Sequence, residues 1–389
     1  MDSLLITIGS FWPKVYGGPS QSVFFLTKSI HDLGYKTLVI SFLEKKDNTQ
    51  TLWFWLKNKS IHTTEDGVNV ISLPRNLIGL MMYFKILFLD SFLKTKTIYM
   101  NSIFFYPTIF SLFYFVFFSS NKLIIAPRGE LDPAALNKSL VLKKTILKIL
   151  KFLFTMRKDV IFHATSKREE QQIKKVFKTN SVKLIENIFL PNYFKTISKK
   201  RYINNKLEKK YFLVLTRIDK KKSIEIILEA YKNLSNCIQN EYDLYIAGEG
   251  KDQDYKNQLI KFVKNNNLNN KVKFIGFLNF EKKVMYLKKA TMLLFPSKGE
   301  NFGNVVLEAW SCYCPVVISN KTPWNLSLND SVGIIVENTS EGFLYGINNI
   351  LEKKKNFSLL DNKVEFNKKL KIFEDKSLLK NYISMFFGV

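Results

Sequence analysis

Cysteine and histidine are scarce in this sequence, with three of each among 389 residues. Cys237, Cys312 and Cys314 are too few for a disulfide framework, which excludes the small disulfide-stapled domains of secreted proteins. Cys312 and Cys314 alone could suggest a metal, but a structural zinc needs four ligands, and the histidines are scattered along the chain. These histidines are His31, His62 and His163. We therefore expect no metal site.

The sequence also lacks apolar runs long enough to cross a membrane. Residues 103–118, IFFYPTIFSLFYFVFF, make a run of sixteen residues that contains Pro107 and Ser111. A spanning helix requires about 20 residues, so we expect a buried helix of an α/β domain here. The first residues, MDSLLITIG, have neither a basic leader nor a cleavage site, and we expect a cytoplasmic protein.

Acidic residues are few: 33 Asp and Glu face 59 Lys and Arg, a formal net charge of +26. A surface this basic attracts nucleic acid, anionic lipid or phosphorylated ligands, and the charge alone does not choose among them. Proteins that bind single strands interleave exposed aromatic and basic residues, whereas the aromatic residues here lie mainly in apolar runs. A basic nucleic-acid-binding protein is therefore the less favoured function class.

Residues 140–158, LVLKKTILKILKFLFTMRK, have the spacing of a basic amphipathic helix. The pattern allows two interpretations. The helix lies on anionic lipid at the inner face of a membrane, or its apolar side packs on the domain and its lysines are simply solvated. The two sides consist of Lys144, Lys148, Lys151 and Lys158, and of Ile146, Ile149, Leu150 and Leu153.

Short apolar runs alternate with amphipathic segments along most of the chain. LLITIG leads into the glycine loop WPKVYGGPS, the helical segment QSVFFLTKSIHDLG and the run KTLVISF, and the same rhythm restarts at YFLVLTRI. The pattern predicts an α/β fold of two doubly wound, Rossmann-like domains that face each other across a cleft. We expect an N-terminal domain at 1–195, a polar linker at 196–210, a C-terminal domain at 211–375, and a helix at 376–389 that packs back on the first domain.

Two carboxylates flank a turn in the stretch FPSKGENFGNVVLEAW. Glu300 follows the predicted strand TMLLFPS, and Glu308 lies within the next predicted helix. Ligands of parallel sheets bind at the carboxyl ends of strands, and backbone N–H groups at a helix start bind phosphate. Carboxylates on both sides of a phosphate would accept hydrogen bonds from hydroxyl-bearing rings, as in a nucleotide-sugar. The alternative is that both glutamates are ordinary surface charges.

Two cations stand in another predicted strand-to-helix loop, RIDKKKS. Arg217 follows the strand YFLVLT directly, and Lys222 comes five positions later. Two such cations can neutralise a diphosphate without a metal ion.

Other motifs are weaker. Asp252–Asp254 (DQD) imitates a metal-binding DxD motif, but we expect it to cap the helix that follows. GEGKDQ begins like a dinucleotide fingerprint but has Gln253 where a third glycine is needed. His163, in FHATS, is more often a satisfied structural histidine than a cleft residue.

With these motifs, the chain resembles the retaining glycosyltransferases of family 4, which have the GT-B fold. The resemblance rests on YGGPS, APRGELDPAAL, HATSKREE, LTRIDKKKS, YIAGEG, VKFIGFL, PSKGENFGNVVLEA and KTPW. It implies that Glu300 binds donor-sugar hydroxyls, that Glu308 binds the ribose, and that the diphosphate is held by Arg217 and Lys222. Catalytic roles accordingly fall to Glu300, Arg217 and Lys222.

The resemblance also implies wider donor and acceptor sites. The donor site would comprise Gly17, Gly18, Arg217, Lys222, Gly248, Glu300, Asn301, Phe302, Gly303 and Glu308. The acceptor side would comprise Arg128, Gly129 and Glu130, because PRGEL stands where some members carry a histidine. Two departures are visible: Tyr313 lies between Cys312 and Cys314 where the family often has Cys-Gly-Thr-Pro, and Ser223 replaces the usual glycine after the diphosphate lysine.

The resemblance implies a retaining, metal-independent hexosyltransferase that uses a nucleoside-diphosphate sugar and no cofactor. Its acceptor would be a glycan, lipid-linked as in capsule, O-antigen or exopolysaccharide assembly, and its partners would include an anionic membrane surface but no nucleic acid. Apart from a nucleic-acid-binding protein, the alternative is another GT-B enzyme, such as a sugar epimerase or phosphorylase.

Overall fold

The computed structural model describes residues 3–11, 17–43, 62–63, 67–89, 97–137, 140–194, 209–324, 332–356, 359–374 and 376–388. The chain divides into two compact units. Unit 1 comprises Met1–Ile188 and Asp375–Val389, and unit 2 comprises Phe189–Glu374. Of the predicted linker at 196–210, residues 196–208 lie outside the described part of the chain, and β9 already begins at Lys210.

Unit 1 is built on an eight-stranded sheet in its described residues, with the order β3-β4-β2-β1-β5-β6-β7-β8. Neighbouring strands pair in parallel, except that β3 runs antiparallel to β4. The strands are β1 (Ser3–Ile8), β2 (Lys36–Leu43), β3 (His62–Thr63), β4 (Asn69–Pro74), β5 (Thr97–Asn101), β6 (Lys122–Ala126), β7 (Ile161–Ala164) and β8 (Val182–Leu184).

The central strands of this sheet are apolar because helices cover both faces. Every residue of β5 is buried, as are Leu4 to Ile8 of β1. Strand order reverses between these two strands, because the chain moves to β2 after β1 and to β6 after β5. The edge where β1 and β5 end is therefore a topological switch point, which is where ligands of such sheets bind.

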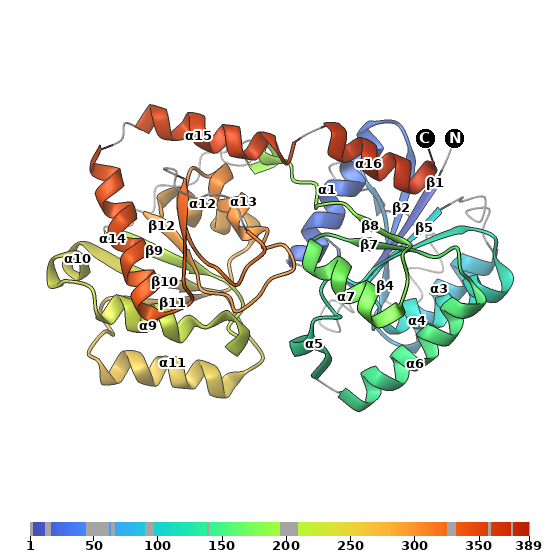
Figure 1. Ribbon diagram of the computed structural model, residues 1–389, viewed down its shortest axis with the longest axis horizontal. Coiled ribbons are helices and arrows are strands. Elements are labelled where there is room, and N and C mark those ends of the chain that lie inside the picture. The colour runs from blue at the N-terminus through green and yellow to red at the C-terminus, as the bar shows by residue number, and fades with distance from the viewer. Residues whose placement is uncertain are drawn as a thin grey trace. The chain divides into compact units, whose positions relative to one another are not determined.

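Helices cross over both faces of the unit 1 sheet (Figure 1). Right-handed crossovers place α1 on one face, where α16 packs beside it, and place α3, α4, α6 and α7 on the other. The helices are α1 (Gly18–Asp32), α3 (Leu77–Leu89), α4 (Tyr106–Phe118), α5 (Pro133–Asn137), α6 (Leu140–Met156), α7 (Lys167–Phe177) and α16 (Lys376–Phe387).

One sequence prediction about these helices needs correction. The apolar run at 103–118 is not a fully buried helix: Leu112 and Phe115 of α4 lie in the core, but Phe110, Phe113 and Phe117 are exposed. A helix on the outside of a sheet can bury only the side that faces the strands.

The apolar side predicted for 140–158 also faces inward in large part. Leu150 and Leu153 of α6 are fully buried in the core of unit 1, and Ile146 packs against that core, whereas Ile149 is exposed. Lys144, Lys148, Lys151 and Lys158 are exposed, as the spacing predicts. Among the described residues, no helix has the length and apolar character required to span a membrane.

Unit 2 contains a six-stranded parallel sheet in its described residues, with the order β11-β10-β9-β12-β13-β14. Strand order reverses between β9 and β12, which are neighbours in the sheet. The strands are β9 (Lys210–Leu215), β10 (Tyr242–Ala247), β11 (Val272–Gly276), β12 (Met292–Phe295), β13 (Val316–Ser319) and β14 (Gly333–Val336). The second switch point therefore lies where β9 and β12 end.

The helices of unit 2 likewise cover both faces of its sheet. The crossovers from β9 to β10 and from β10 to β11 use α9 and α11 on one face of the sheet, and those from β11 to β12 and from β12 to β13 use α12 and α13 on the other face (Figure 1). The helices are α9 (Ile224–Lys232), α10 (Asn236–Glu241), α11 (Gln253–Asn265), α12 (Phe280–Lys289), α13 (Val305–Ser311), α14 (Ser340–Asn356) and α15 (Leu359–Lys371), with a short 3-10 helix at Lys220–Lys222. The α/β fold with two parallel sheets is confirmed.

Candidate functional site

Two loops meet at the switch point of unit 2, one after β9 and one after β12. The backbone N–H of Lys298 in the second loop donates to the carbonyl of Lys221 in the first, at 2.9 Å. β9 and β12 are paired strands, so their carboxyl ends deliver both loops to the same place. The structure thus brings together the two motifs that the sequence placed some 80 positions apart, RIDKKKS and SKGENFG.

Lys222 and Glu300 form an ion pair across these loops. Both side chains are largely buried, with relative exposures of 10% and 16%, and the Lys222 ammonium also lies 5.8 Å from the centre of the Phe295 ring. A pair this shielded interacts more strongly than one in water. It also holds the Lys222 charge in place between the two loops.

The local sequence explains how Lys222 is presented. Asp219 caps the 3-10 helix at Lys220–Lys222, its carboxylate accepting the N–H of Lys221 at 3.0 Å. Ser223 then adopts a left-handed conformation, with φ of +47°, before α9 begins at Ile224. The chain therefore turns sharply after Lys222, and that turn directs the following residues into α9.

Glu308 lies in α13 and is 4% exposed. Its carboxylate accepts a hydrogen bond from Lys283 of α12 at 2.5 Å. The Lys283 ammonium also lies near the rings of Phe194 and Phe280, at 5.9 and 5.5 Å from their centres. Sequence reasoning missed Lys283, because one lysine in a helix of such a basic chain carries no signal of its own.

Arg217 differs from Lys222 in its surroundings. It is exposed, and among the described residues its guanidinium has no hydrogen-bond or ion-pair partner. Its loop packs against the loop after β10: Ile218 donates to the carbonyl of Glu249 at 3.1 Å, and a Cβ added to Gly248 would lie 1.8 Å from the carbonyl oxygen of Thr216. Only glycine at 248 allows this backbone approach.

The segment Asn301–Gly303 follows Glu300 and is fixed by aromatic packing. Gly303 has φ of +84°, and a Cβ added there would lie 2.9 Å from Nε1 of Trp324. Phe302 packs on Trp324 and on Phe373, with ring centres 5.5 and 6.0 Å apart. Trp324 is a second residue that sequence reasoning did not single out, although the motif KTPW contains it.

The glycine pair of unit 1 stands at the start of α1. Gly17 is extended, and Gly18 is the first residue of the helix. Residues 12–16 of the predicted glycine loop lie outside the described residues. Residues 9–11 follow β1 directly, so the chain leaves β1 at the switch point of the unit 1 sheet.

The PRGEL segment follows β6 in the same sheet. The Arg128 guanidinium donates to Asn101 Oδ1 at 2.9 Å, to Asn187 Oδ1 at 2.8 Å and to the Tyr99 hydroxyl at 2.7 Å. The N–H of Gly129 donates to Glu169 at 2.6 Å. Arg128 and Gly129 both have positive φ, so this tight loop depends on the contacts that hold it.

Glu130 ties this loop to the one after β5. Its carboxylate accepts hydrogen bonds from the Ser102 hydroxyl at 2.6 Å and from the backbone N–H groups of Ile103 and Phe104 at 2.6 and 3.1 Å. Burial raises the pKa of Glu130, and these three donors oppose that effect. Glu130 thus fixes the loop after β5, while the acceptor-side role implied by the resemblance stays a prediction.

His163 is completely buried and hydrogen-bonded, as the structural interpretation predicted. Its Nε2 donates to the carbonyl of Ile185 at 2.9 Å, so Nδ1 accepts from the Tyr99 hydroxyl at 2.6 Å, and Tyr99 in turn accepts from Arg128. Burial, aided by the nearby Arg128, lowers the pKa of His163 to about 3. The imidazole is therefore neutral at physiological pH.

The remaining motifs have structural roles in the described chain. The Asp252 carboxylate accepts the N–H of Tyr255 at 2.9 Å and caps α11, as predicted. Cys312 and Cys314 are buried free thiols, and burial raises the pKa of Cys312. Within the described ranges, no three His, Cys, Asp or Glu side chains gather into a group that could hold a metal ion.

A family model described as glycosyl transferases group 1 matches residues 196–369. This span contains both loops of the β9 and β12 switch point. We call residues 196–369, which match this family, the group 1 domain. The predicted glycosyltransferase family is thereby confirmed for this part of the chain.

Among curated proteins, the chain has a relative in Campylobacter jejuni subsp. jejuni, an N-acetylgalactosamine-N,N'-diacetylbacillosaminyl-diphospho-undecaprenol 4-alpha-N-acetylgalactosaminyltransferase. The two are 29% identical over 185 residues, which cover 47% of this chain and 48% of the relative. The chain therefore matches only about half the length of this relative.

Solved structures extend the likeness of fold beyond the group 1 domain. Anabaena HepE, in complex with UDP and glucose, aligns with a TM-score of 0.66 at 17% identity, covering 95% of this chain and all of HepE. Sucrose-phosphate synthase from Thermosynechococcus elongatus aligns with a TM-score of 0.69 at 17% identity, covering 99% and 95%. The predicted GT-B fold is confirmed by these likenesses, which cover 95% and 99% of the chain.

Proposed function

We propose that the protein is a retaining glycosyltransferase that moves a hexose-type sugar from a nucleoside-diphosphate sugar to a lipid-linked glycan. The observation that carries the proposal is the Lys222–Glu300 pair at the switch point of the group 1 domain. Lys222 offers a cation for phosphate, and Glu300 beside it offers a carboxylate for hydroxyls. A nucleotide-sugar has the matching groups side by side, a diphosphate joined to a hydroxyl-bearing sugar.

When the donor binds, the two residues of the shielded pair would contact different parts of it. Donor phosphate would compete with Glu300 for the Lys222 ammonium, and Glu300 would exchange part of that contact for sugar hydroxyls. The exposed Arg217 guanidinium would add a second positive charge on the diphosphate. Glu308, held by Lys283, would accept hydrogen bonds from the ribose hydroxyls.

The transfer itself needs no covalent chemistry from the protein. The bond between sugar C1 and the β-phosphate oxygen breaks, the acceptor oxygen bonds to C1 on the same face, and the acceptor proton passes to the departing phosphate. Charge grows on the diphosphate during this step, so Lys222 and Arg217 stabilise the transition state more than the ground state. We propose that these two cations serve where other transferases use a metal ion.

The acceptor is proposed from the curated relative. Its name specifies a diphospho-undecaprenol acceptor, which is a lipid-linked glycan. The same acceptor class here would place the enzyme at the inner face of a membrane, in the assembly of a capsule, O-antigen or exopolysaccharide.

Sugar transfer should be measured with a panel of nucleotide-sugars, by release of free nucleoside diphosphate and by glycan product. Lys222→Ala should lower kcat/KM by more than about 100-fold, since removing one group that stabilises developing charge costs about 3 kcal/mol. Glu300→Gln should lower kcat more than it weakens nucleoside diphosphate binding, because the freed Lys222 still holds the phosphates. EDTA should leave the rate unchanged.

Matched controls come from the exposed pair on α9, Lys232 and Glu229. Lys232→Ala and Glu229→Gln should transfer sugar at the native rate. A Lys222→Ala variant as active as Lys232→Ala would overturn the donor site. Complete inhibition by EDTA, restored by manganese, would overturn metal independence, and turnover without free nucleoside diphosphate would indicate an epimerase or phosphorylase instead.

A further inference from the structure

The outward side of α4 is a row of phenylalanines. Phe110, Phe113 and Phe117 recur at helical spacing on the side away from the sheet, and Phe118 follows at the helix end. Their exposed fractions are 50%, 40%, 48% and 77%. A surface helix normally carries polar residues on this side. Contiguous exposed apolar residues in a folded domain generally mark an interaction surface.

The neighbouring helix α6 extends this surface. Leu142, Ile149, Phe152 and Met156 are exposed and share one flank of the helix. On the opposite flank, Phe154 packs on Phe177 of α7, with ring centres 5.3 Å apart. Since α6 lies between α4 and α7 on this face of the sheet, the exposed apolar flank is the one directed toward α4 (Figure 1).

Lysines complete the surface. Lys144, Lys148 and Lys151 are exposed and lie on the outermost side of α6, directly opposite the buried Leu150 and Leu153. α3, which packs beside α4, adds the exposed Leu77, Ile78, Met81 and Lys85. The segments that form α3, α4 and α6 contain no aspartate or glutamate. The three helices therefore present exposed apolar and basic side chains and no acidic ones.

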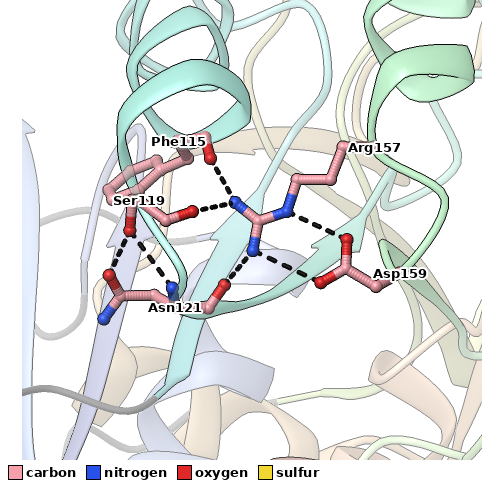
Figure 2. A network of polar contacts seen from close by, with 5 residues as sticks. All are labelled: Phe115, Ser119, Asn121, Arg157 and Asp159. Carbon is pink, nitrogen blue, oxygen red and sulfur yellow. Dashed lines mark hydrogen bonds and ion pairs between the residues drawn. The ribbon is translucent and has the colours of Figure 1, made fainter.

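The two central helices are fixed relative to each other by Arg157, which follows α6. Its guanidinium donates to the carbonyls of Phe115, Ser119 and Asn121 at the end of α4, and it pairs with Asp159 at 3.0 Å (Figure 2). Ser119 lies 2.8 Å from the guanidinium. Arg157 is itself buried, and its hydrogen bond to Phe115 lies in the interior, whereas Asp159 is exposed at the outer end of the network. The phenylalanine row and the lysine row are thus presented together by a rigid pair of helices.

We propose that this α4–α6 face, formed by the exposed phenylalanines of α4 with the apolar flank and lysines of α6, docks on an anionic lipid bilayer. Apolar side chains would enter the boundary between headgroups and acyl chains while the lysines contact anionic headgroups. The interpretation of the 140–158 segment thereby changes: most of its predicted apolar side faces the core, and the lipid contact comes from its flank together with α4.

Charge complementarity and composition favour lipid over other partners. A protein partner for this face would have to offer an apolar surface with many carboxylates, whereas an anionic bilayer supplies both features at once. Nucleic acid is less favoured, since the phenylalanines are joined by aliphatic Leu, Ile and Met side chains that offer no stacking surface. The purpose of docking, access to a lipid-linked acceptor, rests on the proposed function.

Vesicle flotation tests the proposal with the intact protein and no sugar substrate. The protein should bind vesicles of phosphatidylcholine mixed with phosphatidylglycerol, and bind pure phosphatidylcholine vesicles far less. Lys148→Glu with Lys151→Glu should weaken binding to anionic vesicles by more than about tenfold, and added salt should weaken native binding. Phe113→Asn with Phe117→Asn should weaken binding comparably while leaving its salt dependence in place.

Matched controls lie on α11 in unit 2. Lys261→Glu with Lys264→Glu repeats the charge change and spacing on another exposed helix, and Ile260→Asn removes an exposed apolar side chain. These variants should bind like the native protein. Equal losses in test and control pairs would show a general charge effect and overturn the proposal, as would a native protein that ignores anionic vesicles.

Other partners of the α4–α6 face would give different results in these experiments. A native dimer that the phenylalanine substitutions convert to a monomer, without vesicle binding, would assign the face to a second copy of the chain. Preferential retention of single-stranded nucleic acid over vesicles would assign it to nucleic acid. Sugar transfer to an acceptor dispersed in detergent tests the proposed function separately, because it needs no bilayer.

Discussion

Lys222 and Glu300 show what a sequence can and cannot disclose at the scale of single residues. Their loops could be placed at the carboxyl ends of strands, because buried strands and turn residues leave a clear pattern. Their direct pairing could not be predicted, since it depends on which strands become neighbours in the sheet. The same holds for Lys283: nothing in its spacing indicates that it lies beside Glu308.

Both departures from the family pattern fall at residues with left-handed backbone. Ser223 has φ of +47° and Tyr313 has φ of +57°. Glycine adopts this conformation readily, whereas other residues pay about 1–2 kcal/mol for it. Tyr313 gains a partner in exchange, since its ring packs on Phe366 and lies beneath the Lys363 ammonium. Ser223 is buried, and its hydroxyl has no partner among the described residues.

Ser223→Gly should therefore stabilise the protein. Relief of the left-handed strain exceeds the entropy that glycine adds to the unfolded chain, which is about 0.4–1 kcal/mol. Ser223→Ala is the matched variant, because it also removes the unpaired hydroxyl but keeps the strain. We expect urea unfolding to show the glycine variant about 1 kcal/mol more stable than the alanine variant. Equal stabilities would mean that the strain at this turn does not exceed the entropy that glycine adds to the unfolded chain.

At the scale of elements, the sequence best predicts the strands that are buried on both faces of a sheet. The predicted strands YFLVLTRI and TMLLFPS correspond to β9 and β12, whose residues are almost all buried. The short edge strands β8 and β14 were not predicted. β8 is partly or fully exposed, so its residues VKL lack an apolar run. Exposure of α4 was missed because an apolar helix segment gives no sign of which side faces water.

Arg157 connects two elements, and its loss should be costly for that reason. Arg157→Leu would leave the buried carbonyl of Phe115 and the half-buried carbonyls of Ser119 and Asn121 without their donor, at a cost of about 3 kcal/mol in the free energy of unfolding. Asp159→Asn is the control: Asp159 is 66% exposed, so its ion pair contributes at most about 1 kcal/mol. Urea titration of both variants checks the difference. Similar losses would mean that the carbonyl network adds little.

At the scale of the whole molecule, the chain leaves unit 1 after Ile188 and returns at Asp375. The returning helix α16 is held in unit 1 by several contacts. The carbonyl of Phe386 accepts a hydrogen bond from Thr97 at 2.7 Å, and the Tyr35 and Phe387 rings stack with centres 4.4 Å apart. The Tyr382 hydroxyl donates to the carbonyl of Glu186 at 3.0 Å and lies beside His163.

His163 makes this junction sensitive to pH. The native imidazole stays neutral down to its pKa of about 3, whereas the unfolded chain takes up a proton below the ordinary value of 6.5. The unfolded state therefore binds more protons between these values, and stability is complete above pH 6.5 and lost as pH falls. From pH 7 to pH 5 the loss should be about 2 kcal/mol.

Unfolding in urea at both pH values tests this, with His163→Gln as the comparison. The variant has no titrating ring, so its stability should change with pH by about 2 kcal/mol less than that of the native protein. The same pH dependence in both proteins would show that His163 is not protonated selectively in the unfolded state.

The return of α16 also sets an order of events during synthesis. Unit 1 buries Thr97, Tyr99 and His163 beneath a helix that is made only after all of Phe189–Glu374. At about 5–20 residues per second, the ribosome needs on the order of 10–40 seconds for that interval. During this interval, unit 1 lacks the helix that covers these three side chains, while unit 2 can fold completely. The unit that begins the chain is therefore the last to be finished.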